Sequence, residues 1–412
     1  MKSSTLTEML CMCKLDSEWH HSLARAFALA CAGWLFLGHA TISNAQQVKA
    51  DRSIFDRITA AAEKGGATEQ SMLGHIYSEG LLGVGQDPAK AVYWSRKAAE
   101  QGNANAQVDL GNFYSSGNGV AKDYGEAFRC FRKAAEQGNA WGEFFVAMCY
   151  GAGDGVSKDE AATIKWLRKA AEQGCFYHQW CLGVVYAGGD GVVKDIAEAV
   201  KWWRKAAEQG YAEAQYKLGG CYARGTGVAK DAAQAVKWWR KAAEQGCAEA
   251  QYNLGYYYAE GMGAAKDSTE AVKWWRKAAE QGDALAQFNL GYFYSNGRGV
   301  SKDYVEAYKW INLSAAQGFE AASKARNTLE RSVMTPEQIA EGQRLTREFK
   351  PRQTGSPGGD VSSPDVAALR PEASGTGFFI SEDGYLVTNE HVIKESGQVR
   401  LITSVGLIAA KV

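Results

Sequence analysis

The residue of this chain that offers catalytic chemistry is His391, in the string Thr-Asn-Glu-His-Val at residues 388–392. An imidazole in such a setting can act as general base and take a proton from a serine hydroxyl. That chemistry also needs the serine, an acid that orients the imidazole, and an oxyanion hole. Residues 392–412 contain no G-x-S-x-G string, and Asp383 lies in a predicted turn before the histidine. The sequence therefore offers one catalytic residue without its partners.

The residues around His391 have the pattern of short β-strands. Residues 375–412 alternate in polarity and are rich in Val, Ile, Leu and Thr, which is typical of strands. Asp383-Gly384 stands between residues 378–380 and 385–388 and predicts a hairpin. Two further strands are expected at 399–403 and 407–412. Residues 351–374 hold four of the six prolines and predict a linker.

This tail resembles a protease family. Gly-Thr-Gly-Phe-Phe-Ile at 375–380 and Glu-Asp-Gly-Tyr-Leu-Val-Thr-Asn-Glu-His-Val at 382–392 look like the opening of trypsin-like serine proteases of the high-temperature-requirement type. The resemblance implies that His391 holds the position of the catalytic general base. Domains of this kind run to roughly 200 residues, and the Asp and Ser of the triad would follow the histidine. We therefore expect residues 375–412 to be a truncated protease segment and the present chain to be inactive.

The cysteines do not predict a metal centre. Three of the nine lie in the first 45 residues, and the other six carry no C-x-x-C spacing and no histidine at zinc-ligand distance. Whether some of these six form disulfides stays open. We expect no metal and no other cofactor. The six are Cys130, Cys149, Cys175, Cys181, Cys221 and Cys247.

Composition excludes two broad classes of protein. Hydrophobic residues make up 46% of the chain, too many for a disordered protein. Lys+Arg and Asp+Glu number 46 each, so the net charge is zero. A protein that binds nucleic acid through bulk positive charge is therefore not expected. Glycine is frequent and proline scarce, with 46 against 6, which indicates many tight turns or helix ends.

The N-terminus predicts export. Residues 26–38 form an apolar run after Arg25, and Ser43-Asn44-Ala45 supplies small residues for a signal peptidase. The run is too short to cross a hydrocarbon core of about 30 Å. We expect a signal peptide with a long lead at 1–45, cleavage after Ala45, and a periplasmic or extracellular protein without a stable membrane anchor. Met12 is an alternative start.

A 36-residue repeat fills the middle of the chain. The string KAAEQG ends at Gly102 and returns five times at intervals of 36, and AAQG ends at Gly318. Such periods indicate stacked repeats. Each unit has the 3.6-residue periodicity of two helices, an Asp positioned to cap the second helix, and a Glu or Gln three residues later in five of seven units. A glycine also returns inside the first helix, which predicts close approach of a neighbouring helix.

These units resemble the Sel-one-like repeat, a cousin of the tetratricopeptide repeat. The matching strings are A-x-A-Q-x-x-L-G-x-x-Y, G-x-G-V-x-K-D and A-V-K-W-W-R-K-A-A-E-Q-G. The resemblance implies a mainly α fold, a right-handed α-solenoid of seven 36-residue helix-turn-helix repeats over 66–318, which binds other proteins. The cysteine pair of the cysteine-rich members is missing. An N-terminal helix at 46–65 and capping helices at 319–350 complete the expected solenoid.

One row of tryptophans could serve a partner. The periodicity of the second helix predicts an apolar stripe, which in the fifth repeat consists of Ala235, Val236, Trp239, Ala242 and Ala243. The row lies at the edge of this stripe. The row either packs on the next repeat, which aromatic stripes usually do, or forms a partly exposed ladder for another protein. The candidate partner-binding residues are Trp166, Trp202, Trp238 and Trp274.

Two functions fit these observations. In the first, an exported repeat scaffold recruits substrates or regulators to an attached serine endopeptidase, of which this chain holds the first strands. A polypeptide substrate is then expected only where the protease domain is complete. In the second, the chain is a non-enzymatic extracytoplasmic adaptor with a vestigial tail. Both predict other proteins as partners of the solenoid surface, and neither involves nucleic acid.

Overall fold

The structure is a computed structural model, and it describes residues 44–189 and 191–352 together with five short strands between 378 and 410. Most of the predicted signal peptide and most of the predicted linker lie outside these residues, while the predicted cleavage site after Ala45 falls at the start of the helix Asn44–Glu63. The described part of 44–352 is helical and contains no strand. The mainly-α prediction is therefore confirmed for the repeats.

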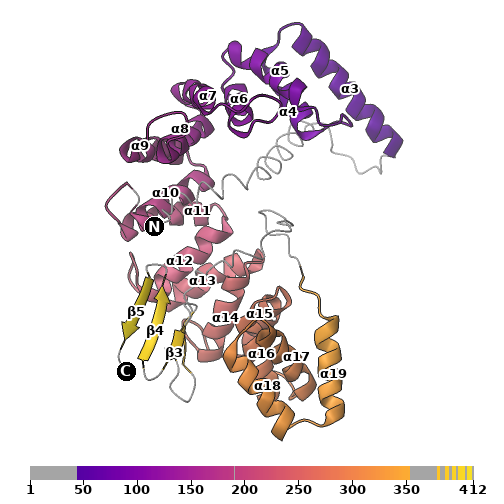
Figure 1. The fold of residues 1–412 in the computed structure, drawn as a ribbon, viewed down its shortest axis with the longest axis vertical. Helices are drawn as coiled ribbons and strands as arrows, with labels where there is room; N and C mark the ends of the chain where they lie inside the picture. The colour runs from indigo at the N-terminus through magenta and orange to yellow at the C-terminus, as the bar shows by residue number, and fades with distance from the viewer. Residues whose placement is uncertain are drawn as a thin grey trace. The chain divides into compact units, whose positions relative to one another are not determined.

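Each repeat consists of two helices of 13 residues. The first helices of the seven repeats are α4 (Ala67–Glu79), α6 (Ala104–Ser116), α8 (Ala140–Ala152), α10 (Phe176–Gly188), α12 (Ala212–Arg224), α14 (Ala248–Glu260) and α16 (Ala284–Asn296). The second helices are α5 (Pro88–Glu100), α7 (Tyr124–Glu136), α9 (Glu160–Glu172), α11 (Ile196–Glu208), α13 (Ala232–Glu244), α15 (Ser268–Glu280) and α17 (Tyr304–Ala316). Figure 1 shows them following one another along the chain.

An aspartate begins every second helix, as the sequence predicts. The carboxylate of Asp231, for example, accepts the backbone N–H of Gln234 at 3.0 Å, and the corresponding bond forms in all seven repeats. This bond satisfies one of the free amides of the first turn. The helices end before a glycine with positive φ, such as Gly246 at 100°, where a side chain would be strained.

The predicted capping boxes of the repeats are wrong. The N–H of Asp195 is not available to Glu198, because it donates to the carbonyl of Tyr186 in the first helix at 2.9 Å. The Glu198 carboxylate instead accepts from Lys201 at 2.8 Å and from the indole of Trp202 at 3.1 Å. Among the described helices, the reciprocal box forms at Thr335 and Gln338.

The glycine inside the first helix marks a close contact, which confirms that prediction. A Cβ on Gly255 would lie 2.5 Å from the indole of Trp275 in the second helix of the same repeat. Gly219 stands in the same relation to Trp239, at 2.6 Å. Both distances are far below van der Waals contact, so the paired helices approach more closely than any side chain at this position allows.

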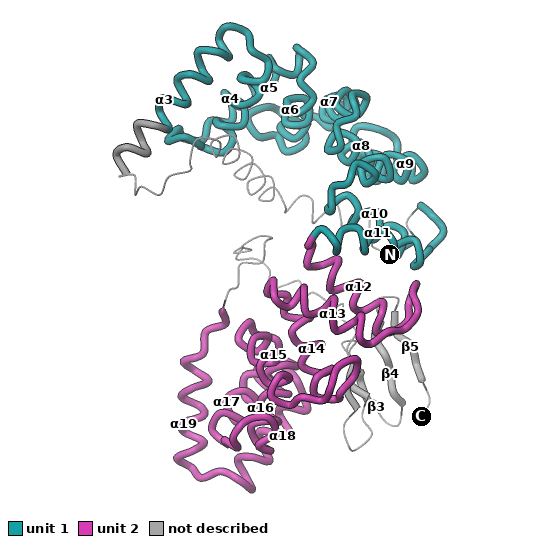
Figure 2. Tube along the Cα trace, turned by 180° about the vertical axis from the view of Figure 1, so that it is seen from behind, with its two compact units in different colours: residues 1–209 teal, residues 210–412 magenta. Residues whose placement is uncertain are grey.

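The helices form two compact units, residues 1–209 and 210–412, coloured separately in Figure 2. In the second unit, one core runs through α13–α18. The apolar stripe predicted for the second helix lies in this core, with Ala235, Val236, Trp239, Ala242 and Ala243 all buried. The first unit has smaller clusters, each formed by helices that are adjacent in sequence.

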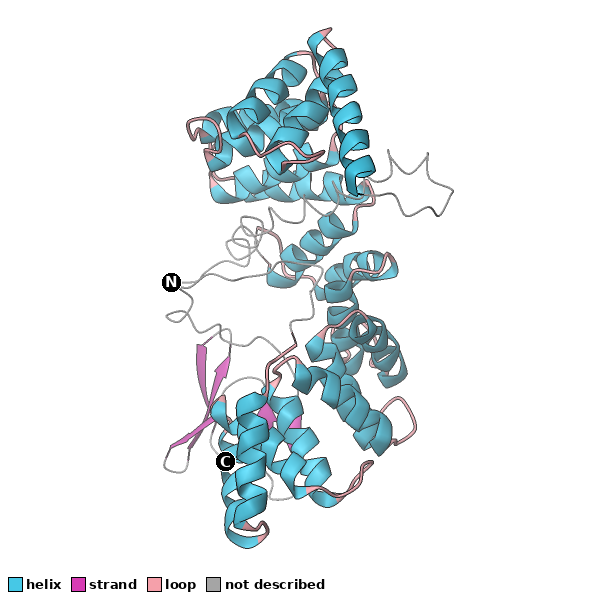
Figure 3. Cartoon of the chain, turned by 90° about the vertical axis from the view of Figure 1, so that its right-hand side faces the viewer, coloured by secondary structure: helices cyan, strands magenta, loops and turns pink. Residues whose placement is uncertain are grey.

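Figure 3 colours the described helices cyan. Three of them, α3, α18 and α19, lie outside the repeats in sequence. α3 (Asn44–Glu63) packs on α4, and α18 (Glu320–Ser332) and α19 (Pro336–Glu348) pack on α17. Phe349 closes on Trp310 with ring centroids 5.5 Å apart. The backbone N–H of Arg352 donates to the carbonyl of Glu280 at 2.8 Å, and its guanidinium pairs with the Glu280 carboxylate at 3.1 Å. The described chain therefore leaves the repeats beside the end of α15.

Five strands follow: β1 (Phe378–Ile380), β2 (Leu386–Thr388), β3 (Val392–Glu395), β4 (Gln398–Thr403) and β5 (Gly406–Ala410). β1 pairs with β2, and β3, β4 and β5 form a second sheet in sequence order, all antiparallel. These short pairings do not identify a trypsin-like barrel. That assignment of residues 375–412 stays a prediction.

Candidate functional site

His391 and the residues directly before it lie outside the described residues, between β2 and β3. The catalytic role of His391 therefore stays a prediction that rests on its sequence neighbours.

The tryptophan row lies mostly inside the protein. Trp202, Trp238 and Trp274 expose 6%, 7% and 8% of their surface, and Trp166 is half-buried. A lysine three residues later covers each ring, with Nζ 3.9 Å from the ring centroid of Trp202 and 4.4 Å from that of Trp238. Packing and cation–π contact therefore account for most of these indole surfaces. Little area is left for the partner contact that the sequence allowed.

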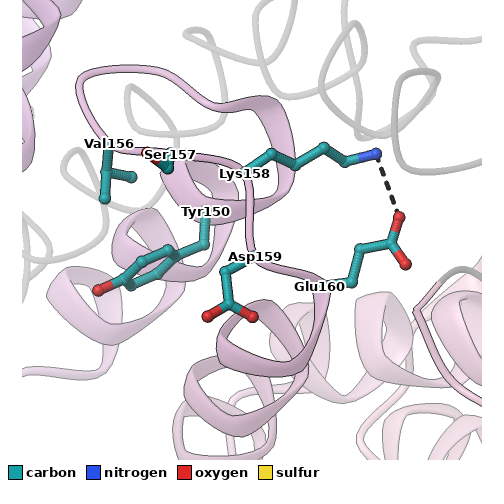
Figure 4. Close-up of a pocket in the computed structure, with 6 residues that line it drawn as sticks. All are labelled: Tyr150, Val156, Ser157, Lys158, Asp159 and Glu160. Carbon is teal, nitrogen blue, oxygen red and sulfur yellow. Dashed lines mark ion pairs between the residues drawn. The ribbon is translucent and has the colours of Figure 1, made fainter.

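A shallow hollow lies between α8 and α9 (Figure 4). Its lining is structural. The N–H of Asp159 donates to the carbonyl of Tyr150 at 3.0 Å, its carboxylate caps α9, and Lys158 pairs with Glu160 at 3.2 Å. The same Asp-to-Tyr bond occurs in all seven repeats at 2.8–3.1 Å. The hollow is therefore a feature of the repeat loop. Its lining residues are Tyr150, Val156, Ser157, Lys158, Asp159 and Glu160.

The described part of the chain contains no cluster of His, Cys, Asp and Glu able to hold a metal ion. The six described cysteines are free thiols. Burial raises the pKa of Cys149 to about 12 and that of Cys130 to about 11. Thiols with such pKa values are protonated at neutral pH and are poor nucleophiles.

A ladder of glutamines, which the sequence analysis missed, joins the helices. The Gln that ends each second helix donates to a buried residue of the first helix of its repeat; Gln281 donates to Gln251 at 2.7 Å. The amide of Gln251 then donates to the carbonyl of Ala243 in the preceding repeat at 3.0 Å. The recurrence of glutamine at these two positions of the repeat was the sequence signal that could have predicted the ladder. The seven first-helix acceptors are Gln70, Gln107, Glu143, Gln179, Gln215, Gln251 and Gln287.

Glu143 is the one acceptor of the seven that carries a charge. Its carboxylate is fully buried, and it accepts from Gln173 at 2.7 Å and pairs with Lys169 at 2.7 Å. A buried carboxylate needs such partners to offset its desolvation. The third repeat therefore uses an ion pair where the others use an amide.

The first helices carry the side chains that differ most between repeats. In the second unit, Tyr216, Glu249 and Asp283 lie close enough to influence one another electrostatically. Burial, and secondarily the Glu249 charge, raises the pKa of Asp283 to about 6. Burial also lowers the pKa of Lys217 and raises that of Tyr216. Tyr216 and Lys217 lie on α12, Glu249 lies on α14, and Asp283 caps the N-terminus of α16.

Known proteins share these repeats. Seven successive segments match the Sel1 repeat, at residues 70–103, 104–139, 142–175, 179–211, 212–247, 248–283 and 284–319. This chain belongs to the Sel1 repeat family. The recognition made from the repeat strings is thereby confirmed, and so is the count of seven. Sel1 repeat proteins generally bind other proteins. No described helix of this one is both long and apolar enough to traverse a bilayer.

Two solved structures have the same repeat fold. One is a protective antigen present in uropathogenic Escherichia coli strains, which displays an SLR fold. It is 35% identical, with a TM-score of 0.65, over 71% of this chain and 64% of that one. The other is a Sel1 repeat protein from Oxalobacter formigenes, 28% identical, with a TM-score of 0.54, over 77% of this chain and 96% of that one.

A short match concerns a different kind of protein. Over 66 residues, this chain is 44% identical to a probable periplasmic serine endoprotease DegP-like from Rhizobium meliloti (strain 1021). The match covers 15% of this chain and 13% of that relative. It gives partial support to a protease segment, while most of the relative has no counterpart in this sequence.

Proposed function

We propose that this Sel1 repeat protein is an exported scaffold that holds other proteins on the first helices of its repeats, next to a trypsin-like serine protease domain that begins in residues 375–412. The observation that carries the scaffold role is the seven-repeat match. The second helices devote their tryptophans and glutamines to packing. The first helices are left as the surface that varies from repeat to repeat.

Two observations support the protease part of the proposal. One is the short likeness to a periplasmic serine endoprotease. The other is the Thr-Asn-Glu-His-Val string. In this function His391 takes the proton of a serine supplied by the remainder of the domain, and the repeats bring polypeptide substrates or regulators close to it. The apolar run at 26–38 supports export.

Site-specific photocrosslinking tests the scaffold role. A benzoylphenylalanine replaces Tyr292, which is 36% exposed on α16, or Lys237, which is exposed on α13. In the native cell, irradiation should join partner proteins to position 292 and few to position 237. Equal yields at both positions, or no protein adducts at 292, would contradict a scaffold that binds through its first helices.

The protease part has a separate test. The reading frame beyond codon 412 should encode an Asp motif and G-x-S-x-G. The complete product should react with a fluorophosphonate probe and lose that reaction when His391 becomes Ala. Residues 1–412 alone should stay unlabelled. A stop codon directly after 412 in the genome would rule out the protease domain and leave the scaffold role intact.

A further inference from the structure

The contact of α8 and α9 with α10, which we name the joint between the third and fourth repeats, buries a histidine. His178, in the first turn of α10, is fully buried. Sibling repeats have a small residue at its position, alanine in four of them and glycine in the third repeat. The stacking of the repeats therefore does not require an imidazole here. The corresponding residues are Ala106, Gly142, Ala214, Ala250 and Ala286.

Two aromatic rings of α8 enclose this imidazole. It stacks on Phe144, with ring centroids 4.9 Å apart and planes at 20°. The indole of Trp141 meets it edge to face, with centroids 4.7 Å apart. Neither ring nitrogen of His178 completes a hydrogen bond. Such surroundings favour the neutral ring, because a charged ring would lose its hydration without compensation.

The charged groups around the first turn of α10 do not compensate a charge on the imidazole. On α8, the buried carboxylate of Glu143 pairs with Lys169 of α9 at 2.7 Å. α9 leads directly into α10, and α11 ends beside it, where Gln209 donates to Gln179 at 2.9 Å. Among the described residues, no group forms a hydrogen bond with either nitrogen of His178. The other charged residues at these two helix ends are Glu172 on α9 and Arg204, Lys205 and Glu208 on α11.

Burial of the neutral ring makes the joint sensitive to acid. The backbone carbonyl of Ala170 in α9 favours the protonated ring, but burial outweighs it and lowers the pKa of His178 to about 4. An exposed histidine titrates near pH 6.5. The stability that the neutral ring contributes is therefore complete above pH 6.5 and is lost as the pH falls from 6.5 toward 4. Between pH 7 and pH 5, the equilibrium between the closed and the open joint should shift about twentyfold toward the open form.

We propose that the joint between the third and fourth repeats is a pH-sensitive hinge, in which mild acid charges His178 and opens the contact of α8 with α10. Each repeat contacts chiefly its neighbours, so one joint can open while others stay closed. Burial raises the pKa of Asp109 on α6 and of Asp283 at α16, so mild acid stabilises those helices instead. The inference goes beyond the scaffold function and does not depend on it.

Hydrogen–deuterium exchange of the full chain at pH 7 and pH 5, corrected for the intrinsic pH dependence of amide exchange, tests the hinge. The protection of amides in α8 and α10 should fall about twentyfold from pH 7 to pH 5, whereas that of amides in α14 and α16 should not fall. His178→Phe keeps a ring on Phe144 and cannot take up a proton, so it should abolish the loss. His178→Ala, which introduces the residue of the sibling repeats, should do the same where the phenylalanine variant does not fold. His75→Gln, on α4, is the control and should leave the loss intact.

Each other outcome contradicts a specific statement. An unchanged loss in a folded His178 variant would overturn the role of this residue. Disappearance of the loss in Glu143→Gln would place the acid response in the neighbouring ion pair. A wild type without the loss would overturn the hinge, and an equal loss in all helices of residues 44–209 would show opening of the whole unit. The crosslinking at Tyr292 decides the scaffold role independently of these results.

Discussion

Replacing Gly255 by alanine tests how the two helices of a repeat are held together. A Cβ at this position would lie 2.5 Å from both Cδ1 and Nε1 of Trp275. Trp275 is 1% exposed, and its indole N–H donates to the carbonyl of Tyr252 at 3.1 Å. The ring cannot move aside without breaking that bond or opening the core. In the third repeat, Ala147 stands at the glycine position, and Leu167 replaces the tryptophan.

The expected cost follows from three terms. Overpacking a filled core costs about 1–3 kcal/mol. Loss of the indole hydrogen bond adds about 1 kcal/mol. Alanine is the better helix former and returns about 1 kcal/mol. Gly255→Ala should therefore lower the free energy of unfolding by about 1–3 kcal/mol, although it adds only a methyl group to a helix.

A double-mutant cycle with Trp275→Leu isolates the contact. The leucine variant recreates the pair found in the third repeat. In that background Gly255→Ala should be neutral or stabilising, by up to about 1 kcal/mol, in urea unfolding followed by circular dichroism. An equal loss of stability in both backgrounds would refute the view that glycine is there to admit the tryptophan ring.

Three further substitutions or reactions probe other features. Asp231→Ala should cost about 1 kcal/mol through loss of the N-cap, with Lys230→Ala as a neutral control in the same urea titration. Burial raises the pKa of Asp109 to about 7, so the folded state holds this proton more tightly than the unfolded state does. The contribution of Asp109 to the free energy of unfolding should then be greatest below pH 4 and decrease as the pH rises toward 7. Asp109→Asn should remove this decrease and raise the thermal midpoint at pH 8. Cys149, whose pKa is about 12, should resist iodoacetamide at pH 8 in the native protein and react in urea; rapid native alkylation would contradict its burial.

Much of the repeat architecture could be predicted from the sequence because it depends on local chemistry. The caps at Asp231 and its equivalents need only residues adjacent in the chain. The close contact between a glycine and a tryptophan could be predicted because the glycine recurs at the same position of the repeat. The reciprocal box at Glu198 failed because the Asp195 N–H is taken by Tyr186, a bond between helices that no local pattern encodes.

The candidate sites depended on contacts that the sequence does not contain. The position of Trp238 at the edge of the apolar stripe left its exposure undecided, and the lysine that covers its ring settles how that surface is used. The glutamine ladder stayed hidden because its partners are 30 or 31 residues apart, as with Gln281 and Gln251. Two glutamines that recur from repeat to repeat can be recognised as bonded partners only when it is known which face of each helix they lie on.

Some side chains recur in every repeat and others do not, and this difference indicates which residues determine binding specificity. Side chains that return at every repeat, such as the capping Asp231 and the ladder residue Gln251, each have a contact within or between repeats that explains them. Trp141 and Tyr177 do not return, and sibling repeats pack with Asn or Glu in their place. The stacking of the repeats requires the recurring side chains and tolerates changes at the others. The residues that decide which protein this solenoid holds are therefore expected among the unrepeated side chains of the first helices.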